Sequence, residues 1–88
     1  MVTGVPFRKT VGDKNPVGKN IVRFRAERHM DQQDLLRELQ LRGVNISQPS
    51  LSRLEGQKRA AKAEELIALA GIFERSIEEL CRPEAQDG

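Results

Sequence analysis

With 88 residues, the chain has room for a single domain built around one hydrophobic core. One cysteine excludes an internal disulfide. With a single histidine there is neither a zinc cluster nor a nucleophile–base pair, so we expect no metal, no cofactor and no enzymatic activity. No apolar run is long enough to cross a bilayer, and the N-terminus lacks the apolar segment of a signal peptide. We therefore expect a cytoplasmic protein without a membrane partner.

The net charge of +2 is unevenly distributed along the chain. Basic and acidic residues number seven and two in residues 1–30, five and four in residues 31–59, and three and seven in residues 60–88, giving net charges of +5, +1 and −4. This asymmetry fits a polyanion-binding surface with a solvated opposite side, but such charge runs are also common on ordinary solvated surfaces. Charge alone leaves both interpretations open.

Residues 1–16 contain two glycines and two prolines and show no helical periodicity, so we expect a flexible, irregular basic arm. The next segment, residues 17–29, is predicted to form the first helix. Its apolar side chains fall on one helical stripe that comprises Val17, Ile21 and Phe24.

Asp31 is the expected N-cap of a second helix, because its carboxylate can accept hydrogen bonds from the free amides of the first turn. The buried face of this helix is expected to comprise three leucines, Leu35, Leu36 and Leu39. The helix is predicted to run to residue 41 or 42 and to stop at Gly43, where a left-handed conformation costs glycine little. We expect Leu41, Val44 and Ile46 to pack onto the core, because three exposed aliphatic side chains in one turn would be unusual.

The third helix is predicted over residues 48–55, with Ser47 as its N-cap. Pro49 is compatible with this position, since amides in a first turn lack partners within the helix. Leu51 and Leu54 lie three residues apart and are expected to face the core.

A loop over residues 57–61 is expected to lead to a fourth helix. Its apolar stripe is predicted to comprise Ala63, Leu66, Ile67, Ala70 and Phe73. Ser76 and Glu79 form a capping box for a short fifth helix, which we expect Ile77 and Leu80 to anchor and Pro83 to end.

These elements predict an all-α fold of five helices. We expect the folded domain to cover residues 17–82, between the arm over residues 1–16 and a frayed C-terminus over residues 83–88. Cys81 is expected to be a small buried hydrophobe near the end of the last helix.

The second and third helices are short, joined by a turn that contains glycine, and the third begins with small polar side chains. These features are typical of a helix-turn-helix, whose recognition helix reaches base edges in the major groove. Gln48 could contact adenine in a bidentate way, Arg53 could contact guanine, and Ser50 or Ser52 could reach a phosphate or a base. Many helical modules without a nucleic acid partner share the same plan, so spacing alone leaves this alternative open.

The chain resembles the Cro/repressor-type (XRE) helix-turn-helix domains of phages and bacteria over about residues 17–81. The most specific part is the run Ser-x-x-Ser-Leu-Ser-Arg-Leu-Glu over residues 47–55, followed by the glutamine at position 32. Further matches lie within residues 21–36 and 66–80. The segment between the second and third helices is longer than is usual in the family, and Gly56 follows Glu55 directly, without the usual intervening residue.

The resemblance implies a lambda-repressor-like domain and assigns roles to individual residues. Residues implied to face base edges are Gln48, Pro49 and Arg53. Residues implied to contact the DNA backbone are Gln32, Ser47, Ser50, Lys58 and Arg59. Residues implied to form a salt bridge within the fold are Arg25 and Glu55.

We therefore expect a sequence-specific regulator of transcription that binds duplex DNA, as a repressor acting by operator occupancy. The resemblance also implies a homodimer on two half-sites about one helical turn apart. The alternative is a protein–protein adaptor, such as an antitoxin-like module that binds a protein partner. The basic arm is expected either to insert into a DNA groove or to be disordered.

Overall fold

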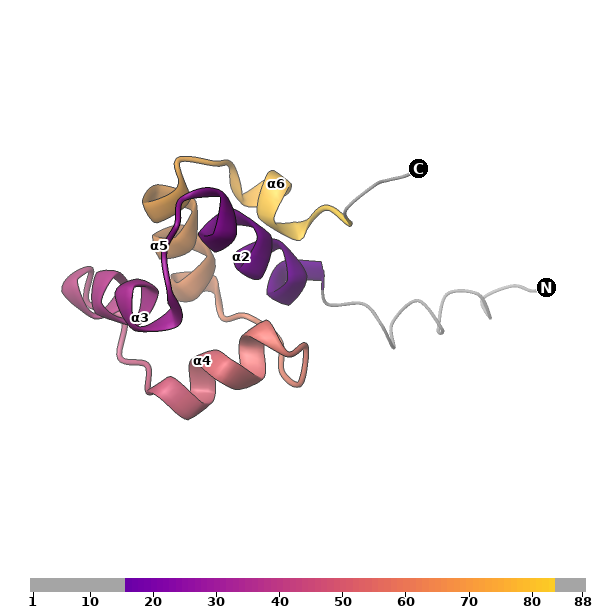
Figure 1. The fold of residues 1–88 in the computed structure, drawn as a ribbon. Helices are drawn as coiled ribbons and strands as arrows, with labels where there is room; N and C mark the ends of the chain where they lie inside the picture. Colours follow the sequence, from indigo (N-terminus) through magenta and orange to yellow (C-terminus); the bar gives the residue numbers. More distant parts are fainter. Residues whose placement is uncertain (1–15, 84–88) are drawn as a thin grey trace.

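The computed structural model describes residues 16–83, which form five helices arranged as in Figure 1. The helices are α2 (Pro16–Glu27), α3 (Gln32–Leu41), α4 (Gln48–Glu55), α5 (Ala63–Phe73) and α6 (Ile77–Cys81). Residues 16–83 contain no strand, so the predicted all-α fold of five helices is confirmed. The first helix begins at Pro16, whereas the rest of the expected arm lies outside the described residues. None of the helices in this range is long and apolar enough to cross a membrane.

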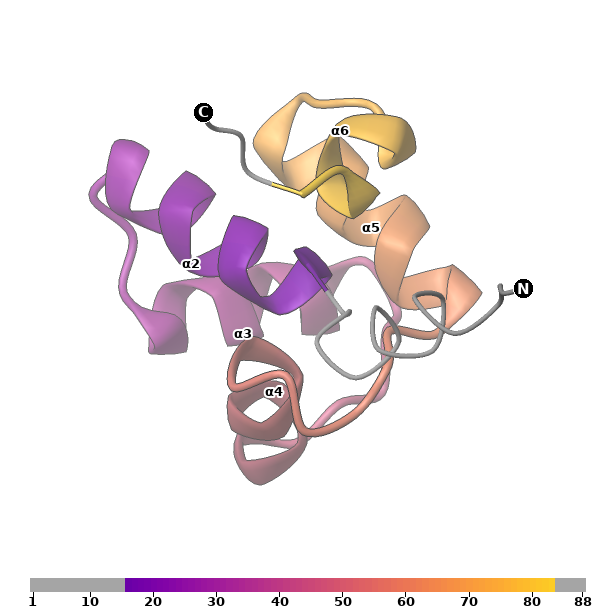
Figure 2. The same ribbon diagram turned by 90° about the vertical axis from the view of Figure 1, so that its right-hand side faces the viewer.

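One hydrophobic core joins all five helices. Its completely buried large side chains are Ile21, Leu35, Leu39, Leu51, Leu54, Leu69, Phe73 and Leu80. In both views, α4 lies at one end of the molecule and α6 at the other, while α2, α3 and α5 lie between them (Figures 1 and 2). α2 contacts both α4 and α6, so it links the two ends of the molecule.

The predicted helix caps are present. Asp31 accepts a hydrogen bond from the Asp34 N–H and completes a capping box at the start of α3. Ser47 accepts from the Ser50 N–H at the start of α4, and Ser76 forms the capping box of α6. Gly43 follows α3 with a φ of 86°, the left-handed conformation that its position predicts.

α2 ends two residues earlier than predicted, at Glu27 instead of residue 29. The Met30 N–H donates to the Arg25 carbonyl at 2.9 Å, and His29 takes a left-handed φ of 55° between them. This backbone hydrogen bond satisfies a terminal carbonyl and turns the chain toward α3.

The apolar turn after α3 is only partly buried. Val44 and Ile46 pack into the core as predicted, but the prediction for Leu41 is wrong, because this side chain is 73% exposed. Leu41 lies two residues after the buried Leu39, which places it about 200° around the helix and away from the core. Helical geometry therefore outweighs the cost of exposing one leucine.

The predicted apolar stripe is only partly correct, because Phe73 is buried and Leu66 and Ala70 pack against the core, whereas Ala63 and Ile67 lie on the exposed side of α5. The buried residues of α5 are Glu65, Ala68, Leu69, Ile72 and Phe73. Two apolar stripes interleave in this helix, and the one that faces the core includes leucine, isoleucine and phenylalanine. The predicted stripe has the same three kinds of large apolar residue, so contacts with the other helices select the buried face and leave Ile67 exposed.

In α6, Leu80 is completely buried, whereas Ile77 and Cys81 are exposed. The expectations that Ile77 anchors this helix and that Cys81 is buried are therefore wrong. A helix of five residues has little more than one turn, so a single side chain is enough to fill the space that it offers to the core.

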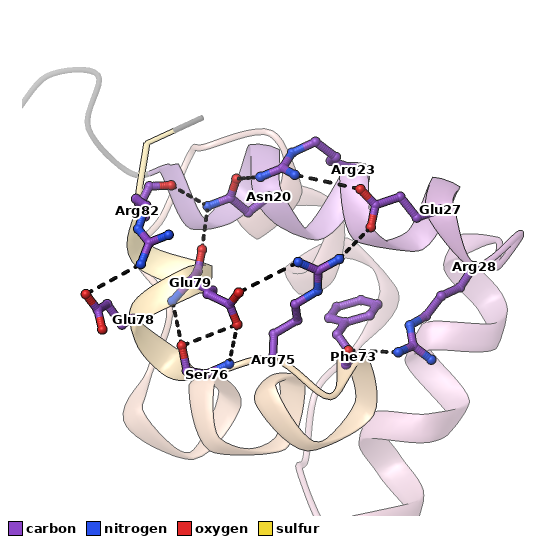
Figure 3. A network of polar contacts seen from close by, with 10 residues as sticks. All are labelled: Asn20, Arg23, Glu27, Arg28, Phe73, Arg75, Ser76, Glu78, Glu79 and Arg82. Carbon is purple, nitrogen blue, oxygen red and sulfur yellow. Dashed lines mark hydrogen bonds and ion pairs between the residues drawn. The ribbon is translucent and has the colours of Figure 1, made fainter. Parts of the chain in front are cut away.

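Asn20 holds α6 against α2 (Figure 3). Its side chain is completely buried, and its amide nitrogen donates to the carbonyls of Leu80 at 2.7 Å and Arg82 at 2.8 Å. These carbonyls end a helix and need donors from outside it. The Asn20 amide oxygen accepts a hydrogen bond from Arg23 at 2.9 Å, so both ends of the amide are used.

Arginine side chains from α2 and from the segment after α5 flank a single aromatic ring at the same junction. The guanidinium carbons of Arg23 and Arg75 lie 4.8 and 4.5 Å from the centre of the Phe24 ring. Glu27 pairs with both guanidinium groups, as Figure 3 shows. Phe24 itself packs edge-on against Phe73, so the charged layer covers the aromatic part of the core.

Gly18 allows the backbones of α2 and α4 to touch. A Cβ atom at this position would lie 2.3 Å from the Leu54 carbonyl oxygen and 2.9 Å from that of Glu55. Both atoms belong to the backbone of α4, so neither can move without displacing the helix. The absence of a side chain at position 18 thus sets how closely α4 approaches α2.

Replacing Gly18 by alanine is expected to lower the free energy of unfolding by about 2 kcal/mol, because the added methyl group overpacks a backbone contact. Urea unfolding followed by circular dichroism measures the loss. Gly71→Ala is the matched control, since its Cβ would meet only the flexible Arg42 side chain at 3.7 Å. Because Gly71 lies within α5, this substitution should instead stabilise by about 0.5–1 kcal/mol. Equal stability of the two variants would contradict the proposed contact.

Candidate functional site

α4 presents a polar surface on the side opposite the core. Leu51 and Leu54 are completely buried, which turns the intervening positions of this helix outward. The exposed residues of the helix and its cap are Ser47, Gln48, Pro49, Ser52 and Arg53. Arg53 forms no ion pair within residues 16–83, so its guanidinium projects from the helix with its N–H groups available.

Gln32, at the start of α3, is the hydrogen-bonding centre of this surface. Its amide oxygen accepts from the Gln48 amide and from the Ser52 hydroxyl, both at 3.2 Å. Its amide nitrogen donates to the Glu55 carboxylate at 3.1 Å. Two side chains one turn apart on α4 are thus held by one side chain of α3.

Arg25 and Glu55 form an ion pair between α2 and the last turn of α4. The Arg25 Nε and Nη2 atoms donate to the two carboxylate oxygens of Glu55 at 3.0 and 2.9 Å, which is the bidentate geometry. The side chains are 17% and 7% exposed. Arg25 also donates to the Met30 carbonyl at 3.0 Å, which ties the α2–α3 connection to the same pair.

These contacts form one continuous chain of hydrogen bonds. It starts at Met30, passes through Arg25, Glu55 and Gln32, and ends at Gln48 and Ser52 on the exposed surface. Every link joins residues from different helices or connections. The orientation of the outward side chains therefore depends on groups that lie inside the domain.

The two basic residues after α4 have different surroundings. Lys58 is exposed, whereas the Arg59 side chain is only 19% exposed. Both terminal nitrogens of Arg59 donate to the Glu65 carboxylate at 2.9 Å, and its Nε donates to the Ser50 carbonyl at 3.1 Å. The arginine that the sequence placed on the DNA backbone is thus engaged within the domain.

Glu65 remains ionised in this position. Burial raises the pKa of its carboxyl group, but hydrogen bonds from Arg59 and from the Lys62 N–H outweigh burial and hold that pKa below its ordinary value. The Lys62 N–H donates at 2.8 Å. The buried carboxylate is therefore fully paired at neutral pH.

Sequence reasoning missed two participants in these networks, Ser52 as a partner of Gln32 and Glu65 as a partner of Arg59. The signal for Ser52 was its position four residues after Gln48, which places both side chains on one face of a helix. The spacing of Arg59 and Glu65 in the sequence does not indicate whether the two side chains pair with each other or are both solvated. Within residues 16–83, no group of three or more histidine, cysteine, aspartate or glutamate side chains could hold a metal ion.

A comparison with protein families gives a match over most of the chain. Residues 20–86 match the model of the Cro/C1-type HTH DNA-binding domain, and this range includes every residue of the networks described above. Comparisons with curated proteins and with solved structures give no match.

Replacing Arg25 by alanine is expected to lower the free energy of unfolding by about 3 kcal/mol, because it leaves the Glu55 carboxylate buried without its cation. Arg25→Lys should lose part of this, since an ammonium group cannot form the two parallel bonds. Thermal and urea unfolding measure both losses. Arg37→Ala is the control, because Arg37 pairs with Asp34 on the exposed surface of α3 and should contribute little. Equal losses for Arg25→Ala and Arg37→Ala would contradict a structural role of the buried pair.

Proposed function

The chain belongs to the family of Cro/C1-type HTH DNA-binding domains, and from this premise we propose that it is a sequence-specific repressor that acts by occupying an operator in duplex DNA. The observation that carries this proposal is the polar face of α4, on which Gln48 is oriented by Gln32 while Arg53 projects into solvent. A short helix with such a face fits the major groove.

Gln48, whose side chain is held by Gln32, is suited to recognise adenine. Its amide donates one N–H to Gln32, which leaves the amide oxygen and the second N–H for a base. Adenine presents one donor and one acceptor in the major groove, so these two groups complete a bidentate contact. Arg53 offers the two parallel donors that guanine accepts, and the Pro49 ring offers an apolar contact to a thymine methyl group.

We assign the DNA backbone to the residues that surround this face. Ser47 and Ser50 lie in the first turn of α4, and Lys58 is exposed just after the helix. Gln32 uses only one of its two amide hydrogens in its contact with Glu55, so the second is available to a phosphate oxygen. Phosphate contacts of this kind fix the register of a protein on DNA without reading its sequence.

Binding as a homodimer follows from the small number of base contacts that one copy offers. α4 has eight residues, of which Gln48, Pro49 and Arg53 are proposed to reach bases. Two copies on half-sites about one helical turn apart would double this number and give a nearly palindromic operator. Occupation of such a site excludes other proteins from the same DNA, which is sufficient for repression.

A second candidate function is binding to a protein partner, as an adaptor or an antitoxin-like module. The observation in its favour is a pair of exposed aliphatic side chains, Leu41 and Ile67, on neighbouring helices. Ile67 also lines a groove of about 420 Å³ between α5 and residues 42–44, which follow α3. An electrophoretic shift of DNA distinguishes this candidate from the repressor, because the adaptor requires no nucleic acid.

The affinity for DNA is expected to fall steeply as salt rises. Each phosphate that a lysine or arginine neutralises contributes about −0.9 to the slope of log K against log salt concentration. Fluorescence anisotropy with a labelled duplex, from low to physiological salt, measures this slope. An affinity that is independent of salt would contradict DNA binding and favour the adaptor.

Base-contacting and phosphate-contacting residues are expected to differ in their effects. Gln48→Ala and Arg53→Ala should each weaken binding to a selected duplex by about 1–3 kcal/mol while changing binding to random DNA little. Lys58→Ala should weaken both about equally. The control is Arg82→Ala, which also removes one positive charge, but next to α6 at the opposite end of the molecule. It should leave the affinities for the selected duplex and for random DNA unchanged. If all four variants bound alike, the assignment of roles would be wrong.

A further inference from the structure

We infer that Arg59 and Glu65 are positioning residues that fix the recognition helix α4 for base reading, and that Arg59 does not neutralise a DNA phosphate. This inference rests on the proposed function and changes one assignment within it. Among the residues that the family resemblance places on the DNA backbone, Arg59 is removed from the phosphate contacts and Lys58 stays among them.

The guanidinium of Arg59 joins three parts of the chain. It binds the Glu65 carboxylate in the first turn of α5 through two hydrogen bonds of 2.9 Å. It binds the Ser50 carbonyl within α4 at 3.1 Å, and the Ala60 carbonyl in the connecting loop at 3.0 Å. These bonds use the Nε atom and both terminal nitrogens, so the guanidinium is held along its whole edge.

Arg59 differs from the exposed basic residues in that its side chain is largely buried. The side chains of Arg59 and Glu65 are 19% and 4% exposed. To bind a phosphate as its main partner, Arg59 would have to leave Glu65, and the carboxylate would then remain buried without a cation. The neighbouring Lys58 carries the same charge on an exposed side chain and reaches solvent without such a cost.

The contact with Ser50 attaches α4 to α5, in addition to the contacts of α4 with α2 and α3. Near its C-terminal end, Glu55 holds the helix to Arg25 and Gln32. In its N-terminal half, the Ser50 carbonyl holds it to Arg59 and through it to α5. An attachment to a further helix restricts the tilt of α4 more than the contacts with α2 and α3 do alone. The tilt of α4 decides whether Gln48 and Arg53 reach base edges together.

A positioning role and a phosphate contact have opposite signatures in DNA binding. A lost phosphate contact lowers the salt dependence and weakens binding to all sequences alike. A lost positioning contact leaves the salt dependence unchanged and weakens the selected sequence more than random DNA, because the base contacts become misaligned. Arg59 and Lys58 are adjacent in the sequence, so each is a matched control for the other.

The experiment measures binding of the full chain to a duplex selected from random DNA and to a random duplex, each across a range of salt. Arg59→Lys and Glu65→Gln are both expected to reduce the ratio of selected to random affinity by about tenfold, with the salt slope of the wild type. Lys58→Gln should keep this ratio and lower the magnitude of the slope by about 0.9. Arg59→Lys keeps the charge, so charge alone cannot explain its loss of discrimination.

Circular dichroism and thermal unfolding establish that each variant is folded at the temperature of the binding measurement, which is lowered if necessary. Full discrimination by a folded Arg59→Lys variant, or a reduced salt slope for Arg59→Gln equal to that of Lys58→Gln, would overturn this inference while leaving the proposed function intact. If the wild-type chain bound no duplex in a salt-dependent way, the proposed function would fail first, and this inference would fail with it.

Discussion

The carboxylate of Glu55 is the group on which the exposed face of α4 depends. It lies in the last turn of the helix, where the free carbonyls make a negative charge unfavourable. Arg25 compensates this charge through two parallel hydrogen bonds, and the carboxylate can then accept a third from Gln32. Because Gln32 in turn holds Gln48 and Ser52, a charge pair inside the domain determines the geometry of side chains on its surface.

The cations near α4 fall into two groups with different roles. Arg25 and Arg59 are largely buried and paired with glutamates, so they connect helices and add little positive charge to the surface. Arg53 and Lys58 are exposed and leave the surface positive where DNA would lie. The basic residues of such a domain are therefore better classified by burial and partners than by their positions in a motif, since adjacent residues can belong to different groups.

The sequence predicted most of the fold because the strongest signals were local. Asp31, Ser47 and Ser76 bond to amides within three residues, and Gly43 needs only its own backbone to end a helix. The predictions were wrong where contacts between residues far apart in the sequence determine which side chains are buried. α5 has two interleaved apolar stripes, and only the packing of other helices selects one. The roles of Asn20 and Arg59 also depend on partners that local periodicity does not specify. The ion pair between Arg25 and Glu55 is not specified by local periodicity either, but the family resemblance implied it.

Asn20 also holds the beginning and the end of the described residues next to each other. It lies one turn into the first helix and donates to the Arg82 carbonyl at 2.8 Å, next to the last described residue. The first helix and the residues after the last helix are thus neighbours in space, although 62 positions separate Asn20 from Arg82. Domains with adjoining ends tolerate insertion and circular permutation well. We therefore expect that residues 16–83 can be inserted into a surface loop of another protein without separating the helices.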